Sequence, residues 1–513
     1  MKKTILAVAL PLIIYGCSDE SSNLSNADKF KTFEQNYLAA TQTVINKSTE
    51  FSTGAVAYEA NFSNVNDQVS LQDQFTYTDQ QNAASIEYNI TSQANVDLAK
   101  YNPENGRALI KGQANGGVVI DVEAAGETVK LNNLFANADY EGTLDEKAKT
   151  FSYNVKMAKN TVPVLLSDVA IAELTLNDFT NDIVLNFNKD YTDLTALKSG
   201  SEGKSIQIKA TGELAKEVDA NIDLTKLVSS TNYQASPLKY ETVASLGNLA
   251  MSATNKNSDN VETFKFDVSK IEAKSGIYEE KGLLSGNVAY HVGNVAVTKD
   301  QSPKLDFGAI SVDTNIKGIK NIKNWKALIE QANALSSQDP SDMNEAEAQE
   351  FLKTIASLFT KDTRLNMSFE NKLTIGDELK ASIAFQPSEK LVALLQEGPE
   401  AIEAMVENQS PVDLIDAFIH EFSFKGKVTE DYIIAQYEKF LTLDGQDTAS
   451  AKKDVQGAIQ MVMMLVGMQS AQLGASPLEY KERTLFMDIE FKQGTWNING
   501  KKLTTAEIFA AFQ

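Results

Sequence analysis

Cysteine and histidine, which commonly act in hydrolysis or bind metals, are scarce in this 513-residue chain. There is one cysteine, Cys17, and there are two histidines, His291 and His420, each inside an alternating apolar stretch. Two isolated imidazoles without a cysteine partner do not make a zinc site. A Gly-x-Ser-x-Gly nucleophile motif does not occur in the sequence. The sequence therefore predicts no metal, no cofactor and no catalytic residue.

Pairs of carboxylates are the other groups that could catalyse a reaction, as the acid and base of a glycosidase. Asp182 with Asp190, and Asp377 with Glu378, are examples. Because the chain has 69 acidic residues, such pairs are expected by chance. A carboxylate-based hydrolase is therefore the alternative function and not the first hypothesis.

Gly203-Lys204-Ser205 matches the last three residues of a phosphate-binding loop. That motif needs a glycine five residues before Gly203, where this chain has Lys198. The surrounding pattern also lacks the change from strand to helix that such a loop requires. We interpret these residues as an ordinary loop.

Cys17 lies where a bacterial signal peptide would be cut. Lys2 and Lys3 form a charged start, and residues 5–15 are an apolar run of signal-peptide length. Ile14-Tyr15-Gly16-Cys17 resembles the bacterial lipobox, in which cleavage between Gly16 and Cys17 is accompanied by attachment of a diacylglyceryl group to the cysteine sulfur. We expect the mature chain to begin at Cys17 and to be held on a membrane by this covalent lipid.

Two alternatives to lipidation are an ordinary buried thiol at Cys17 and an uncleaved transmembrane anchor over residues 2–15. The apolar run over residues 5–15 would span only about 16 Å as a helix, at ~1.5 Å per residue. A bilayer core needs about 20 apolar residues. The length of the run therefore favours a cleaved signal peptide over a transmembrane anchor.

The residues after Cys17 suggest where the anchored protein resides. Ser18 favours the outer membrane over the inner membrane, although Asp19 leaves the inner membrane open. We expect the folded chain on the periplasmic face of the envelope, joined to the lipid by the polar tether Ser18–Asp28. An intrachain disulfide cannot form, since Cys17 is the only cysteine.

The charge balance excludes one class of partner. The chain has 47 Lys and Arg against 69 Asp and Glu, a formal net charge of -22. Such a surface repels phosphate backbones and anionic lipid headgroups, so we expect no nucleic-acid partner and no electrostatic attraction to phospholipid. The identity of a protein or lipid partner, and homo-oligomerisation, stay open.

Alternation of apolar and polar residues dominates the region from Phe51 to Ile316 and predicts many antiparallel strands with one wetted face. Helical spacing occurs instead at residues 27–45, 325–335, 345–359 and 391–406, with strands over 364–385. The predicted fold class is α+β, with a large, mostly antiparallel β-rich region, flanking amphipathic helices and a mixed C-terminal unit. The expected segments are a signal peptide (1–16), a lipidated tether (17–28), a helix with the β-rich region (29–320), a middle region (321–409) and a C-terminal unit (410–513).

The C-terminal unit carries a family resemblance. An alternating strand, residues 422–428, leads into helices over 432–443 and 449–471 and a strand over 480–491. The closing segment, residues 494–503, contains Gly-x-x-x-Ile-Asn-Gly-Lys-x-Leu, whose Asn499-Gly500 pair also favours a hairpin turn. This order resembles the YdgA-like family of Gram-negative envelope proteins, a domain of unknown function. The resemblance implies an envelope location and transfers no catalytic residue.

Ile459–Met468 places four methionines in a predicted helix that is apolar on most faces. Core packing is the favoured interpretation, and a flexible lining for acyl chains or a partner is the other. A long sheet likewise has an apolar face that must be covered, for example by a lipid. The first hypothesis is therefore a noncatalytic, lipid-anchored envelope protein that acts as a scaffold or binds a lipid or envelope partner in a groove on its sheet. The alternative is the carboxylate-based hydrolase, acting on an envelope polymer.

Overall fold

A computed structural model describes residues 25–49, 55–65, 68–81, 84–122, 126–256, 262–300, 302–321, 345–373, 377–471 and 473–510. Gly16, Cys17 and the helix expected over residues 325–335 lie outside these ranges. The chain divides into two compact units, unit 1 (Met1–Thr263 with Asn324–Ser337) and unit 2 (Phe264–Lys323 with Gln338–Gln513). This boundary falls inside the expected segment 29–320, because the alternating pattern continues on both sides of it.

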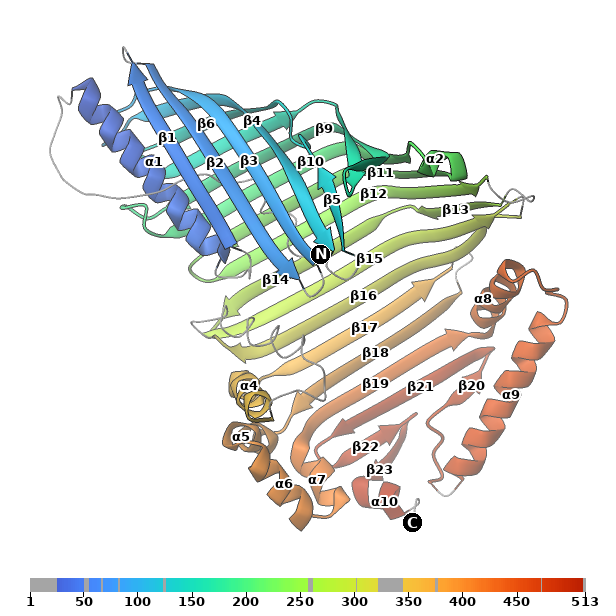
Figure 1. The fold of residues 1–513 in the computed structure, drawn as a ribbon. Helices are drawn as coiled ribbons and strands as arrows, with labels where there is room; N and C mark the ends of the chain where they lie inside the picture. The colour runs from blue at the N-terminus through green and yellow to red at the C-terminus, as the bar shows by residue number, and fades with distance from the viewer. Residues whose placement is uncertain are drawn as a thin grey trace. The chain divides into compact units, whose positions relative to one another are not determined.

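Unit 1 is mostly antiparallel β-structure with one long helix (Figure 1). Its helices are α1 (Asn26–Thr49) and the short α2 (Leu214–Glu217). Its strands are β1 (Ala55–Val65), β2 (Gln68–Gln81), β3 (Ala84–Asp97), β4 (Arg107–Val122), β5 (Glu127–Leu131), β6 (Ala138–Asp145), β7 (Thr150–Met157), β8 (Asn160–Leu166), β9 (Val169–Phe187), β10 (Leu194–Ala210), β11 (Val218–Gln234) and β12 (Lys239–Asn255).

The strands of unit 1 pair in the order β1-β2-β3-β4-β6-β7-β9-β10-β11-β12. A second path runs from β4 through β5 and β8 to β9. Together with the path through β6 and β7 it closes a ring of six strands, β4-β6-β7-β9-β8-β5. Val118, Met157 and Leu176 belong to a small apolar core formed by strands of this ring.

Helix α1 supplies the main core of unit 1. Phe33, Tyr37, Ala40 and Val44 recur every three or four residues and are buried, so one stripe of the helix faces the sheet. The Tyr37 ring lies 5.8 Å from that of Phe62 and 5.6 Å from that of Phe151, centroid to centroid. The helix expected over residues 27–45 is thereby confirmed, and it continues to Thr49.

Unit 2 is also mostly antiparallel β-structure with several helices (Figure 1). Its strands are β13 (Thr263–Val268), β14 (Ile271–Glu280), β15 (Leu283–Lys299), β16 (Leu305–Lys320), β17 (Arg364–Lys372), β18 (Glu378–Pro387), β19 (Ile419–Thr429), β20 (Glu479–Lys481), β21 (Thr484–Lys492), β22 (Thr495–Ile498) and β23 (Lys501–Thr504). Its helices are α4 (Glu345–Leu358), α5 (Glu389–Glu397), α6 (Pro399–Asn408), α7 (Pro411–Phe418), α8 (Glu430–Leu443), α9 (Ala451–Ser470) and α10 (Thr505–Ala510).

The sheet of unit 2 runs β15-β16-β17-β18-β19-β21-β22-β23, with β13 and β14 both paired to β15 and β20 paired to β21. Helix α4 joins β16 to β17, and helices α5 to α7 join β18 to β19, all at one end of the strands. Helices α8 and α9 follow the other end of β19 (Figure 1).

Two elements differ from those expected from the sequence, one in the C-terminal unit and one in unit 1. The single strand expected over 480–491 is two strands, because Glu482 and Arg483 both adopt positive φ, 48° and 58°, and turn the chain. The loop expected at residues 203–205 is wrong, since these residues lie within β10. Gly203 allows the ring of Phe179 on β9 to pack across it, where a Cβ would overlap that ring.

Candidate functional site

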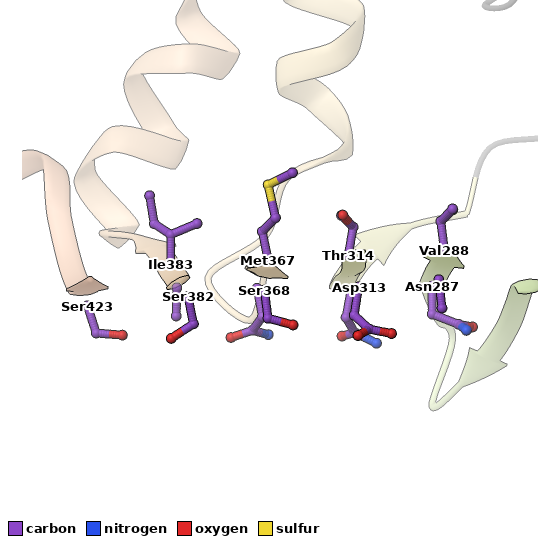
Figure 2. A pocket seen from close by; sticks show the side chains of 13 residues that line it. Asn287, Val288, Asp313, Thr314, Met367, Ser368, Ser382, Ile383 and Ser423 are labelled. Atoms are coloured by element: carbon purple, nitrogen blue, oxygen red, sulfur yellow. The ribbon is translucent and has the colours of Figure 1, made fainter. Parts of the chain in front are cut away.

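The sheet of unit 2 has one apolar and one polar face. On neighbouring strands, residues directly opposite each other share a face. One such row is apolar apart from Thr314 and consists of Val288, Thr314, Met367, Ile383, Phe424 and Ile489. Figure 2 shows the first four of these side chains on one side of the sheet, and Asn287, Asp313, Ser368, Ser382 and Ser423 on the other. We call these sides the apolar face and the polar face.

Further apolar rows lie beside the first. One contains Ile316, Leu365, Phe385, Phe422 and Phe491. On the same face, beyond the opposite flank of the first row, Val312 and Phe369 form a row with Tyr290 of β15. Much of this surface is not covered: Met367 is 46% exposed, Ile383 is 37% exposed, and Leu365 and Tyr290 are exposed as well. Contiguous exposed apolar surface of this kind commonly marks a binding site.

Helices cover the apolar face near one strand end. Gln436 of α8 donates to Asn371 Oδ1 at the end of β17, 3.3 Å away. Leu485 of β21 packs against a core of Ile434 on α8 with Val455 on α9. These contacts leave the middle of β17 and β18, where Met367 and Ile383 lie, outside the covered area.

At the opposite strand end, residues beside α4 and α5 bond to the sheet and to each other. Thr360, just after α4, donates to the carbonyl oxygen of Gly318 at 2.7 Å. Ser388 caps α5 by accepting from the Leu391 amide, and its hydroxyl donates to the carbonyl oxygen of Ala417. The exposed apolar strip, which contains Met367 and Ile383, therefore lies between two helical groups. Helices α8 and α9 form the group at one end of the strands, and α4 and α5 form the group at the other end.

The polar face contains a shallow hollow of about 410 Å³, within the range of small-molecule sites. The residues that line it from this face are small or polar: Asn287, Ala289, Asp313, Asn315, Asn366, Ser368, Ser382, Ala384 and Ser423 (Figure 2). Asp313 is the only carboxylate among all the lining residues. A glycosidase needs two carboxylates about 5 to 10 Å apart, so this lining does not supply the pair.

His291 lies next to this hollow, on β15. Its Nδ1 is 3.0 Å from Ser311 Oγ and its Nε2 is 3.7 Å from Asp313 Oδ1, on the neighbouring strand β16. The three residue types are those of a hydrolytic triad, and here they lie on the neighbouring, paired strands β15 and β16. These contacts orient the imidazole of His291 on the polar face of the sheet. His420 is separate from it, at the start of β19.

The structure does not bring the carboxylate pairs noted in the sequence into a common cleft. Asp182 lies in β9, where it accepts from Asn154 at 2.6 Å, and Asp190 lies in the turn beyond that strand. The five extended residues from Asp182 to the end of β9 alone span about 17 Å. Lys427 and Lys380 donate to Glu378 and hold the pKa of that carboxyl below its usual range, which is the wrong direction for a general acid.

Unit 1 buries a carboxylate that sequence patterns do not reveal. The side chain of Glu146 is fully buried and accepts hydrogen bonds from Asn36 of α1 at 2.8 Å and from Tyr101 at 2.8 Å. Its second oxygen accepts from Tyr191 at 3.0 Å and from Lys149 at 2.9 Å. Burial, and then the charge of Glu146, raise the pKa of both tyrosines, so these phenols stay protonated and keep donating. This carboxylate fixes α1 to the turns of the sheet.

A second buried carboxylate, Asp73, lies in β2 under the same helix. Ser92 donates to its Oδ1, and the Tyr58 hydroxyl lies 3.4 Å from its Oδ2. Burial raises the pKa of Asp73 to about 6, while the hydrogen bonds from Ser92 and Tyr58 oppose this shift. In the sequence Asp73 is one more acidic residue on an alternating strand, so its depth follows only from the packing of α1.

The core-packing interpretation of the methionine helix is wrong for one face of α9. Met461, Met464 and Met468 are exposed, while Val455 and Ile459 are buried. In the described part of the chain, no helix is long and apolar enough to cross a membrane. Nor do the described residues contain a group of three or more His, Cys, Asp or Glu side chains that could hold a metal ion.

The segment that resembles the YdgA-like family forms β19, α8, α9, β20, β21 and the β22-β23 hairpin. The Asn499-Gly500 turn of this hairpin is confirmed, with φ of 47° and 89°. Asn499 also donates to the Ser476 carbonyl oxygen and accepts from the Asp488 amide, each at 2.7 Å, which is a structural role for this motif residue. The family assignment stays a prediction: no family model, no curated protein and no solved structure matches this chain.

Proposed function

We propose that this protein is a noncatalytic, lipid-anchored protein of the bacterial envelope that binds the acyl chains of a lipid or lipoprotein along the apolar face of unit 2. The observation that carries the proposal is the exposed apolar strip around Met367 and Ile383, which lies between two helical groups. A side chain that is about two-fifths exposed contributes about 1 kcal/mol when a ligand covers it. Several such side chains in one strip favour an extended apolar ligand.

The dimensions of the strip suit an acyl chain. The row from Val288 to Ile489 crosses β15, β16, β17, β18, β19 and β21. At about 4.8 Å between strands, this row is about 24 Å long. One leaflet of a bilayer is roughly half of a ~30 Å hydrocarbon core, so an extended acyl chain fits within the row. Flexible Met367 lies near the middle of the row and adapts to different chain shapes.

Attachment through Cys17 supports the same function, because it would keep the binding face near a source of lipid. We propose the periplasmic face of the envelope as the location, and the outer membrane in preference to the inner membrane. Relationship to the YdgA-like family, proposed from residues 410–513, agrees with this location. The hydrolase alternative is less favoured, because the polar hollow offers Asp313 without a second carboxylate in its lining.

Intact mass spectrometry and lipid extraction of the full chain, purified from membranes of a Gram-negative host, test the proposal. The expected mass is that of residues 17–513 plus a diacylglyceryl group and an N-acyl chain, with additional lipid released by organic solvent. In Cys17→Ala the covalent mass should disappear while the extractable lipid is kept. An unmodified chain that begins at Met1 would refute the anchor, and a lipidated chain without extractable lipid would refute the binding face.

A further inference from the structure

Helix α9 exposes an apolar surface of its own, distinct from the sheet. Met464 is 60% exposed and Met468 is 69% exposed, and Met461 and Leu465 are exposed beside them. At 100° per residue these four positions fall on one side of the helix. Gln460 and Val462, which flank this side of the helix, are exposed as well. We call this side of α9 the methionine face.

The segment that contains the methionine face carries no charge. Residues 455–478 contain no Asp, Glu, Lys or Arg, in a chain of which 23% is charged. Lysines lie near both ends of this segment: Lys452 and Lys453 are exposed in the first turn of α9, and Lys501 donates to the carbonyl oxygens of Leu473 and Gly474 just beyond the helix. Asp454 is exposed in the same first turn and accepts from Ser450. An uncharged stretch of helix with lysines near each end suits hydrocarbon flanked by phosphate groups, because two lysines outnumber the one carboxylate in the first turn of α9.

The opposite side of α9 is packed on protein. Val455 and Ile459 are buried against α8, in a core with Ile434. Lipid therefore cannot surround α9, and only the methionine face is available to it. Such a helix can lie in the plane of a membrane surface, with its exposed side in the boundary between headgroups and acyl chains.

A protein partner fits this surface less well. Protein interfaces carry about one hydrogen bond per 100 to 200 Å² and a polar rim. The exposed side chains on and beside the methionine face are Gln460 and otherwise those of methionine, leucine, valine and alanine. Hydrocarbon requires no hydrogen bonds, and the flexible thioethers of methionine adapt to a fluid surface.

We infer that α9 is a membrane-contact helix, whose methionine face inserts into the surface of a membrane with zwitterionic phospholipid headgroups. The net charge of -22 disfavours an anionic surface. Membrane contact by α9 would place unit 2 at a source of lipid, so the inference rests on the proposed lipid-binding function. It is tested by a separate experiment.

The test measures the depth of α9 in the full lipoprotein, reconstituted in phosphatidylcholine vesicles with brominated acyl chains. Tryptophan is introduced at Met464→Trp or Met461→Trp, and the emission of the parent protein, from Trp325 and Trp496, is subtracted. Val406→Trp on α6 is the matched control, because Val406 is also an exposed apolar residue on a helix. We expect a blue shift and loss of emission at both α9 positions and neither at position 406.

Three outcomes would overturn the inference. Unshifted, unquenched emission at both α9 positions would mean that the methionine face stays in water. A blue shift without quenching by brominated chains would mean that a protein, including a second copy of this chain, covers it. Equal quenching in phosphatidylglycerol vesicles at low salt would contradict the zwitterionic preference. Solvent extraction of lipid from the same preparations reports on the apolar face of the sheet separately, so the two proposals can fail independently.

Discussion

Met367 and Ser368 are neighbours in β17, yet their side chains project from opposite faces of the unit 2 sheet (Figure 2). Met367 lies on the exposed apolar strip, and Ser368 lines the polar hollow. The period of two residues along a strand produces this separation. The pair provides matched positions for testing which face binds lipid.

We expect Met367→Glu to reduce the lipid that co-purifies with the protein, because a carboxylate in the strip must be desolvated when an acyl chain binds. Ser368→Glu should leave the amount of lipid unchanged, since its carboxylate stays in water. Quantitative mass spectrometry of extracted lipid measures both, with thermal unfolding as a check on folding. Loss of lipid in Ser368→Glu but not in Met367→Glu would place the ligand on the polar face.

Replacement of the buried carboxylate in Glu146→Ala should destabilise unit 1 by about 3 kcal/mol or more, because it leaves the donors of Asn36, Tyr101 and Tyr191 without their buried acceptor. Glu146→Gln should recover part of this loss by accepting from Asn36 and Tyr101. Urea unfolding followed by circular dichroism measures the change. Glu141→Gln is the control, since the Glu141–Lys111 pair is exposed to solvent and should contribute little to stability. Equal effects of Glu146→Ala and Glu141→Gln would contradict the role of Glu146.

The raised pKa of Asp73 predicts that the free energy of unfolding falls as pH rises. Its folded pKa of about 6 lies above the ordinary value of 3.8, so between these values the folded state holds a proton that the unfolded state has released. The contribution of Asp73 to the free energy of unfolding, about 3 kcal/mol, is therefore fully present below about pH 4. It is lost as pH rises through 6.

Asp73→Asn should remove this dependence, because an amide carries no charge and keeps one of the two acceptor oxygens that Ser92 and Tyr58 contact. Calorimetry should show the variant melting above the parent protein at pH 8 and close to it at pH 4. Asp139→Asn, at an exposed position on β6, is the control. The difference between its melting temperature and that of the parent protein should be the same at pH 8 and pH 4. A variant that is less stable than the parent protein at pH 8 would contradict the prediction.

The Asn499-Gly500 turn should be sensitive to both of its residues. Asn499→Ala removes the hydrogen bonds to Ser476 and Asp488 and replaces a residue type that tolerates positive φ with one that tolerates it less, at a cost of about 1 to 3 kcal/mol. Gly500→Ala should cost about 1 kcal/mol through its φ of 89° alone. Chemical unfolding measures both, with exposed Lys502→Ala as the control. A cost for Asn499→Ala no larger than for the control would show that the turn forms without its side chain.

The sequence by itself determined the local features of this protein. Alternation predicted antiparallel strands and showed which residues of a strand share a face, because the period of two is a property of the extended backbone. Helical spacing predicted α1, α4, α8 and α9, and the stretch over residues 391–406 that forms α5 and α6. The signal sequence and Cys17 are likewise linear signals, and they stay predictions.

Only the tertiary structure decided which apolar surfaces are covered. Methionines that the sequence favoured as core lie on the surface of α9, because α8 packs against one side of α9 and leaves the methionine face exposed. Met367 stays exposed because the helices at both strand ends do not meet over the middle of the sheet. Glu146 is buried because Asn36, Tyr101 and Tyr191, far apart in the chain, converge on it. Burial depends on contacts between distant segments, and a local pattern does not contain them.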